Sequence, residues 1–66
     1  MKQVQCASGQ VVWLAFVDDV GPNEGGYYVE VYLDPNGDRW DDFCVPDLGD
    51  RDAMEQYAID YARMEY

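Results

Sequence analysis

The stretch YYVEVYLDPNGDRWDDFC, residues 27–44, decides the fold because it has the signature of two strands joined by a tight turn. Pro35 presets the backbone dihedral at the first central position of the turn, Asn36 tolerates the second, and Gly37 can adopt the left-handed conformation. These residues predict a β-hairpin with a three-residue loop, made of a type I turn and a glycine bulge.

This turn fixes the register of the hairpin if Asp34 pairs with Asp38. The remaining pairs are then Leu33 with Arg39, Tyr32 with Trp40, Val31 with Asp41, Glu30 with Asp42, Val29 with Phe43 and Tyr28 with Cys44. Side chains alternate between the two faces of a sheet. The core face is therefore expected to carry Tyr27, Val29, Val31, Leu33, Phe43 and Val45. The second face is aromatic and acidic, and is expected to carry Tyr28, Tyr32, Trp40 and Cys44 with Glu30, Asp34, Asp38 and Asp42.

The second face of the hairpin is unfavourable as it stands, because acid faces acid. Like charges directly opposite each other on adjacent strands destabilise a sheet by roughly a few tenths of a kcal/mol. Stability alone therefore does not explain this face.

The composition describes a single folded acidic domain spanning residues 1–66. Fourteen acidic residues stand against four basic ones, which gives a net charge of -10 with no histidine. A hydrophobic content of 48% argues against a disordered acidic tail. The charge argues against direct binding to nucleic acid and predicts a basic partner, including one that normally holds nucleic acid.

The rest of the chain supplies two further strands and a helix. Residues 2–6 predict a first strand, and the apolar run VVWLAFV at 11–17 predicts a central strand covered on both faces. Residues 18–26 are rich in glycine, proline and acids and predict a loop. The hairpin provides strands three and four.

A C-terminal helix is predicted from Arg51 to Glu65, after a break at residues 46–49. Asp50 can cap its N-terminus, and Arg63 in its last turn complements the helix dipole. The face expected to pack on the sheet carries Met54, Tyr57, Ala58, Tyr61 and Met64. The predicted fold class is therefore α+β, with a four-stranded, mainly antiparallel sheet and a C-terminal helix packed on one face.

The residue types argue against catalysis and against a specific metal site. The chain has no histidine and no threonine, one serine at Ser8 and one lysine at Lys2, so the usual nucleophile and base pairs cannot be assembled. Asp34, Asn36 and Asp38 have the initial spacing of a calcium loop, but the glycine and the final glutamate of that motif are missing. We expect a non-enzymatic protein without a cofactor or metal.

The two cysteines and the apolar run at 11–17 bear on the compartment. The sequence leaves open whether Cys6 and Cys44 pair, and two reduced, buried thiols are the simpler expectation. The apolar run is too short to span a bilayer. We expect a cytoplasmic monomer with no membrane segment.

The acids of the hairpin have two interpretations. They can form a solvated surface with no specific role. Alternatively, carboxylates two residues apart on a strand lie about 6.7 Å from each other, which is of the order of the phosphate spacing in nucleic acid, and can imitate its backbone for arginine and lysine. Neighbouring tyrosine and tryptophan side chains can then make cation–π contacts. The candidate partner-binding residues are Glu30, Asp34, Asp38, Asp42, Tyr28, Tyr32 and Trp40.

In size, acidity and order of elements the chain resembles the small phage-encoded anti-CRISPR proteins, in particular inhibitors of the type I-C system. The resemblance covers the whole chain as a profile: the VVWLAFV strand, the YYVEVYLDPNGDRWDDF hairpin and the DRDAMEQYAIDYARMEY helix. It implies a protein made in an infected bacterial host that binds the basic DNA-binding surface of a CRISPR effector subunit. An anti-restriction DNA mimic has the same profile, and so does an acidic assembly partner of a basic host protein.

Overall fold

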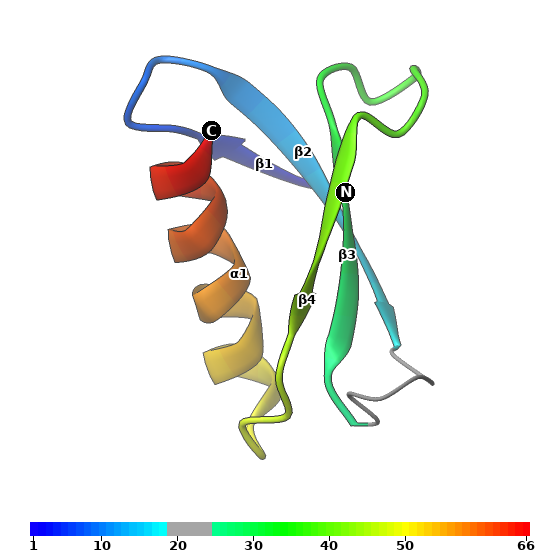
Figure 1. Cartoon of the computed structure of the whole chain (residues 1–66), viewed down its shortest axis with the longest axis vertical. Coiled ribbons are helices and arrows are strands. Elements are labelled where there is room, and N and C mark those ends of the chain that lie inside the picture. Colours follow the sequence, from blue (N-terminus) through cyan, green and yellow to red (C-terminus); the bar gives the residue numbers. More distant parts are fainter. Residues whose placement is uncertain (19–24) are drawn as a thin grey trace.

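Residues 1–18 and 25–66 are described by the computed structural model of the chain, and they form an antiparallel sheet with a helix on one side (Figure 1). The elements are β1 (Lys2–Gln5), β2 (Val11–Asp18), β3 (Tyr27–Tyr32), β4 (Asp41–Val45) and α1 (Arg51–Glu65). The strand order is β1-β2-β3-β4, and each strand pairs antiparallel with the next. The predicted α+β fold, with four strands and a C-terminal helix, is confirmed.

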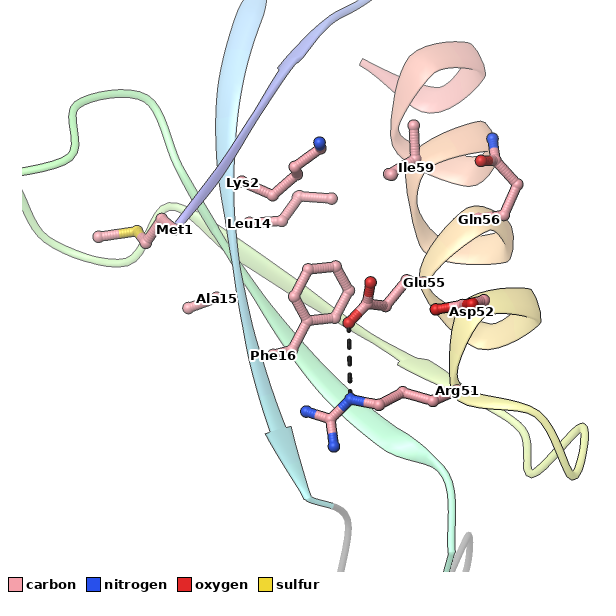
Figure 2. A pocket seen from close by; sticks show the side chains of 10 residues that line it. All are labelled: Met1, Lys2, Leu14, Ala15, Phe16, Arg51, Asp52, Glu55, Gln56 and Ile59. Atoms are coloured by element: carbon pink, nitrogen blue, oxygen red, sulfur yellow. Dashed lines mark ion pairs between the residues drawn. The ribbon is translucent and has the colours of Figure 1, made fainter.

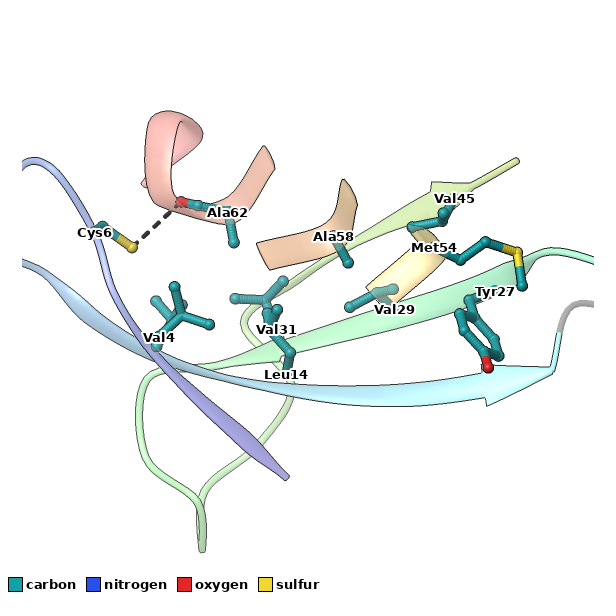
Figure 3. Packing of buried hydrophobic residues seen from close by; sticks show 11 residues of the cluster. Val4, Cys6, Leu14, Tyr27, Val29, Val31, Val45, Met54, Ala58 and Ala62 are labelled. Carbon is teal, nitrogen blue, oxygen red and sulfur yellow. Dashed lines mark hydrogen bonds between the residues drawn. The ribbon is translucent and has the colours of Figure 1, made fainter. Parts of the chain in front are cut away.

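The core lies between α1 and one face of the sheet, where alternate strand residues are apolar (Figure 3). Leu14 on β2 faces Val31 on β3, and Val4 on β1 faces Val12 on β2. Full burial of an aliphatic side chain of this size stabilises the fold by about 1.5–3 kcal/mol. The buried set is Val4, Cys6, Val12, Leu14, Tyr27, Val29, Val31, Val45, Met54, Ala58 and Ala62.

Helix α1 has the predicted bounds, and the Asp50 side chain caps it by accepting from the Asp52 backbone N–H at 3.1 Å. Its buried stripe is Met54, Ala58 and Ala62, spaced four residues apart. Small alanine side chains allow the helix backbone to approach the sheet closely, whereas a tyrosine stripe would hold it away. The prediction for Met54 and Ala58 is therefore confirmed. The prediction is wrong for Tyr57, Tyr61 and Met64, which are 43%, 39% and 86% exposed.

The prediction that β2 is covered on both faces is wrong. Strand β2 is central in the sheet, between β1 and β3. Val12 and Leu14 are fully buried under α1, but on the opposite face Val17 is 44% exposed and Trp13 is partly exposed. The continuous apolar run therefore has one face in the core and one face toward solvent. The loop predicted at residues 18–26 falls largely on residues 19–24, which lie outside the described residues.

The hairpin register is confirmed where the strands pair. The ladder joins Val31 with Asp41, Glu30 with Asp42, Val29 with Phe43 and Tyr28 with Cys44. Strand β3 ends at Tyr32 and β4 begins at Asp41, so the pairs predicted beyond these residues are not part of the ladder. Leu33, predicted in the core, is 41% exposed for the same reason.

The loop at residues 33–40 is wider than the predicted three-residue loop. Its tight turn forms, because the Gly37 N–H donates to the Asp34 carbonyl at 2.9 Å. Gly37 does not have the positive φ that a glycine bulge requires, so that part of the prediction is wrong. The Trp40 N–H donates to the Val31 carbonyl at 2.8 Å, which holds the chain just before β4 begins.

Candidate functional site

The sheet face that points away from α1, called the open face below, collects the aromatic and acidic side chains of the strands. The register places Trp13 opposite Tyr32 and Glu30 opposite Asp42 on this face. Alternation along the strands assigns to it Trp13, Ala15, Val17, Tyr28, Glu30, Tyr32, Asp42 and Cys44.

The two opposed carboxylates on the open face share one arginine. The Arg39 guanidinium lies 3.7 Å from a Glu30 carboxylate oxygen and 3.8 Å from one of Asp42. The same guanidinium donates to the Tyr28 hydroxyl at 2.7 Å, and that hydroxyl donates to Asp42 at 2.9 Å. Arg39 therefore supplies a counter-charge that makes the acid pair tolerable. Sequence reasoning missed it, although Arg39 is the one cation in the hairpin sequence.

The tyrosine hydroxyls of the open face act as bridges between its charged groups. The hydrogen bond from Tyr28 to Asp42 raises the pKa of the Tyr28 hydroxyl, and burial adds to this effect. The Tyr32 hydroxyl lies 3.4 Å from a Glu30 carboxylate oxygen, at the long end of hydrogen-bond range. The face thus offers carboxylates to a cation and aromatic rings to the stem of its side chain.

The predicted site residues divide into those on the open face, the acids in the loop at residues 33–40, and Trp40, whose ring lies apart from both. Tyr28, Glu30, Tyr32 and Asp42 are brought together on the open face. Asp34 and Asp38 lie in the exposed loop beyond the strand ends, where the Asp34 carboxylate accepts from the Asn36 backbone N–H at 2.9 Å.

Trp40 does not share the open face, because its ring packs on Tyr66 at the end of α1, with centroids 5.1 Å apart. The prediction of Trp40 beside Tyr32 is therefore wrong. The tryptophan that faces Tyr32 is Trp13. The signal for Trp13 in the sequence was its position in VVWLAFV, two residues from Val11 and Ala15, on the face that α1 leaves uncovered.

Both cysteines are free thiols, and their surroundings differ. Cys6 is buried, its thiol donates to the Ala62 carbonyl at 3.3 Å, and burial raises its pKa. Cys44 is exposed on the open face, so the expectation of two buried thiols is wrong for Cys44. Cys6 bonds to Gln10 just before β2, whereas the ladder puts Cys44 level with Val17 near the other end of β2. The two thiols are therefore separated along the strands as well as across them, which is beyond the reach of a disulfide.

A groove lies on the other side of the sheet, between β1, β2 and the first half of α1 (Figure 2). It has a volume of about 760 Å³ and contains the ion pair between Arg51 and Glu55 at 3.7 Å. Its lining residues are Met1, Lys2, Leu14, Ala15, Phe16, Arg51, Asp52, Glu55, Gln56 and Ile59. In residues 1–18 and 25–66 no three acidic or cysteine side chains gather in a way that could hold a metal ion.

The chain matches no protein-family model, no curated protein and no solved structure. Among the residues that the structure describes, no helix is long and apolar enough to cross a membrane.

Proposed function

We propose that this chain is an anti-CRISPR inhibitor that binds a type I, I-C-like, CRISPR effector complex and blocks target DNA binding by acidic mimicry of DNA. The supporting observation is the guanidinium seated on the open face. Arg39 lies within 4 Å of both Glu30 and Asp42 and donates to Tyr28. A face that holds its own arginine in this way has the chemistry to hold the arginines of a DNA-binding surface.

In this proposal the open face replaces a stretch of phosphate backbone. Glu30 and Asp42 receive the cationic side chains that would otherwise contact phosphates, while Trp13, Tyr28 and Tyr32 contribute contact area. The net charge of -10 accelerates association with a basic groove and makes it sensitive to salt. The inhibitor acts as a monomer in the cytoplasm of the infected bacterium.

Competition with target DNA tests the proposal. A purified type I-C effector is mixed with labelled target duplex, and the inhibitor is added over a range of concentrations and salt. The variant Glu30→Gln/Asp42→Asn is expected to compete at least about tenfold less well, which corresponds to ~1.4 kcal/mol. Its matched control is Asp52→Asn/Asp60→Asn on α1, which removes the same charge and is expected to change competition by less than about threefold.

The control separates the possible results. Equal losses in both double variants mean that net charge alone matters, which contradicts a role for the open face. A larger loss in the α1 variant moves the contact to the helix. Retention of the chain by a restriction enzyme or another basic host protein, with no effect on effector binding to DNA, favours one of the two other functions.

A further inference from the structure

A second aromatic surface lies where α1 meets the edge strand β4, on the helix side of the sheet. The Phe43 ring on β4 packs at a tilt against Tyr61 of α1 with centroids 4.4 Å apart, and the Trp40 ring packs at a tilt against Tyr66 at 5.1 Å. The Tyr66 hydroxyl also donates to Asp41 at 2.7 Å. Asp41 lies between Trp40 and Phe43 in the sequence, so the two ring pairs are neighbours along β4. We call this surface the aromatic ridge, and it comprises Trp40, Phe43, Tyr57, Tyr61, Met64 and Tyr66.

Much of the aromatic ridge is open to solvent, although Phe43 and Tyr66 are partly buried against the core. Trp40 is 50% exposed and Tyr61 39%, and the same helix flank continues to Met64, which is 86% exposed. Contiguous exposed aromatic side chains of this kind mark interaction surfaces in monomeric proteins, and tryptophan and tyrosine are the residues that most often dominate binding energy.

The rim of the aromatic ridge is negatively charged. Asp41 accepts a hydrogen bond from the Tyr66 hydroxyl. Burial raises the pKa of the Tyr61 hydroxyl, and the negative charges of Glu65 and Asp41 raise it further. The three arginines form ion pairs away from the ridge rings: Arg39 with Glu30 and Asp42, Arg51 with Glu55, and Arg63 with Asp60. The remaining basic side chain, Lys2, lies on β1 and lines the groove on the other flank of α1.

We propose that the aromatic ridge is a second docking surface and that its occupant is a protein segment in which arginine or lysine side chains flank aliphatic ones. The aliphatic side chains would cover Trp40 and Tyr61, and the cations would meet Asp41 and Glu65. A second copy of this chain fits poorly, because two molecules with a net charge of -10 repel each other and would bring these acids together. The ridge is separate from the open face, since alternation places Phe43 and Asp42 on opposite faces of β4.

The two tryptophans report on the two surfaces separately, which makes a direct test possible. Trp13 lies on the open face and Trp40 on the aromatic ridge, so their indole N–H signals in a ¹⁵N-labelled sample follow each surface independently. The probe is a short peptide of alternating arginine and leucine, and a peptide of alternating serine and leucine is its control. The arginine peptide is expected to shift the Trp40 signal in a saturable manner, and the serine peptide is expected to leave it in place.

Variants then assign the binding to the ridge. Tyr61→Ser is expected to weaken the binding seen at Trp40 by at least about fivefold, and Tyr57→Ser, whose ring is 43% exposed, provides a second variant that disturbs the fold less. The open-face variant Glu30→Gln/Asp42→Asn is expected to change the peptide affinity measured at Trp40 by less than about twofold. The proposal is overturned if the peptide moves Trp13 alone or neither signal. It is also overturned if Trp40 shifts with protein concentration in the absence of peptide, because a second copy then occupies the ridge.

Discussion

Glu30 and Asp42 lie directly opposite each other on β3 and β4, with the Arg39 guanidinium 3.7 Å and 3.8 Å from their carboxylates. The pair is therefore a charge cluster with a net charge of about -1 rather than two unscreened acids. This arrangement stabilises the face in the free protein and leaves the cluster negative enough to attract a cation.

Arg39→Ala is expected to lower the free energy of unfolding by about 0.5 kcal/mol, because it restores repulsion between the two carboxylates. The same change made in a Glu30→Gln/Asp42→Asn background is expected to have no effect. Urea unfolding of the four proteins measures the coupling. Arg63→Ala, which removes a surface partner of Asp60, is the control for loss of one positive charge. An equal loss in both backgrounds would show that Arg39 acts through Tyr28 instead.

The two thiols are expected to react with a thiol reagent in two well-separated phases. Cys44 is exposed and should be modified quickly, whereas Cys6 is buried, hydrogen-bonded to Ala62 and has a raised pKa, so it should wait for local opening. Cys6→Ala is expected to cost about 1 kcal/mol and Cys44→Ala close to nothing. Intact mass under native and denaturing conditions follows the reaction. A single fast phase for both thiols would place Cys6 outside the core.

Ala58→Leu is expected to destabilise the protein by about 1–3 kcal/mol, because Ala58 is fully buried where α1 approaches the sheet and has no room for a larger side chain. Ala53→Leu makes the same chemical change at an exposed position of the same helix and should leave the thermal midpoint nearly unchanged. Thermal unfolding followed by circular dichroism compares the two variants. Equal midpoints would mean that the helix packs on a different face.

Tyr66→Phe is expected to raise the pKa of Asp41 toward its ordinary value. In the folded protein that pKa is lowered, first by the hydrogen bond from the Tyr66 hydroxyl and then by the backbone N–H of Asp42. A lowered carboxyl pKa gives stability that is present above the unfolded pKa and is lost as the pH falls through the folded one. The variant should therefore show a smaller drop in stability on the acid side.

A carboxyl-carbon NMR titration of Asp41 checks the shift directly. Part of the lowering is expected to remain in the variant, since the Asp42 N–H still donates at 2.8 Å. An unchanged titration curve would mean that the Tyr66 hydroxyl does not hold Asp41 in solution.

The elements were predictable where local chemistry sets them. Asp50 caps α1 by its own side chain, and the period-two alternation from Tyr28 to Val31 fixes which residues face the core. The register of β3 and β4 followed from the tight turn, even though the turn has a different glycine conformation from the predicted one.

The side chains that were misplaced depend on tertiary packing. The helix face could not be chosen from periodicity, because the stripe with Tyr57 and Tyr61 and the stripe with Ala58 and Ala62 are both apolar. The alanine stripe faces the sheet because its small side chains let the helix pack closer to the strands. Trp40 lies in the irregular loop before β4, where alternation no longer applies. Its ring packs against Tyr66, which is twenty-six residues later in the sequence.

The uncrossed strand order has a consequence for folding kinetics. Each strand finds its partner in the adjacent strand of the chain, so sheet formation requires the closure of short loops, at a small entropic cost. Docking of the helix requires the closure of a long loop, because it brings residues far apart in the sequence together. The hydrogen bond from the Ala7 N–H to the Arg63 carbonyl at 2.9 Å is one such contact. The sheet is thus able to nucleate before α1 arrives, and changes at Ala62 are expected to accelerate unfolding while leaving the folding rate nearly unchanged.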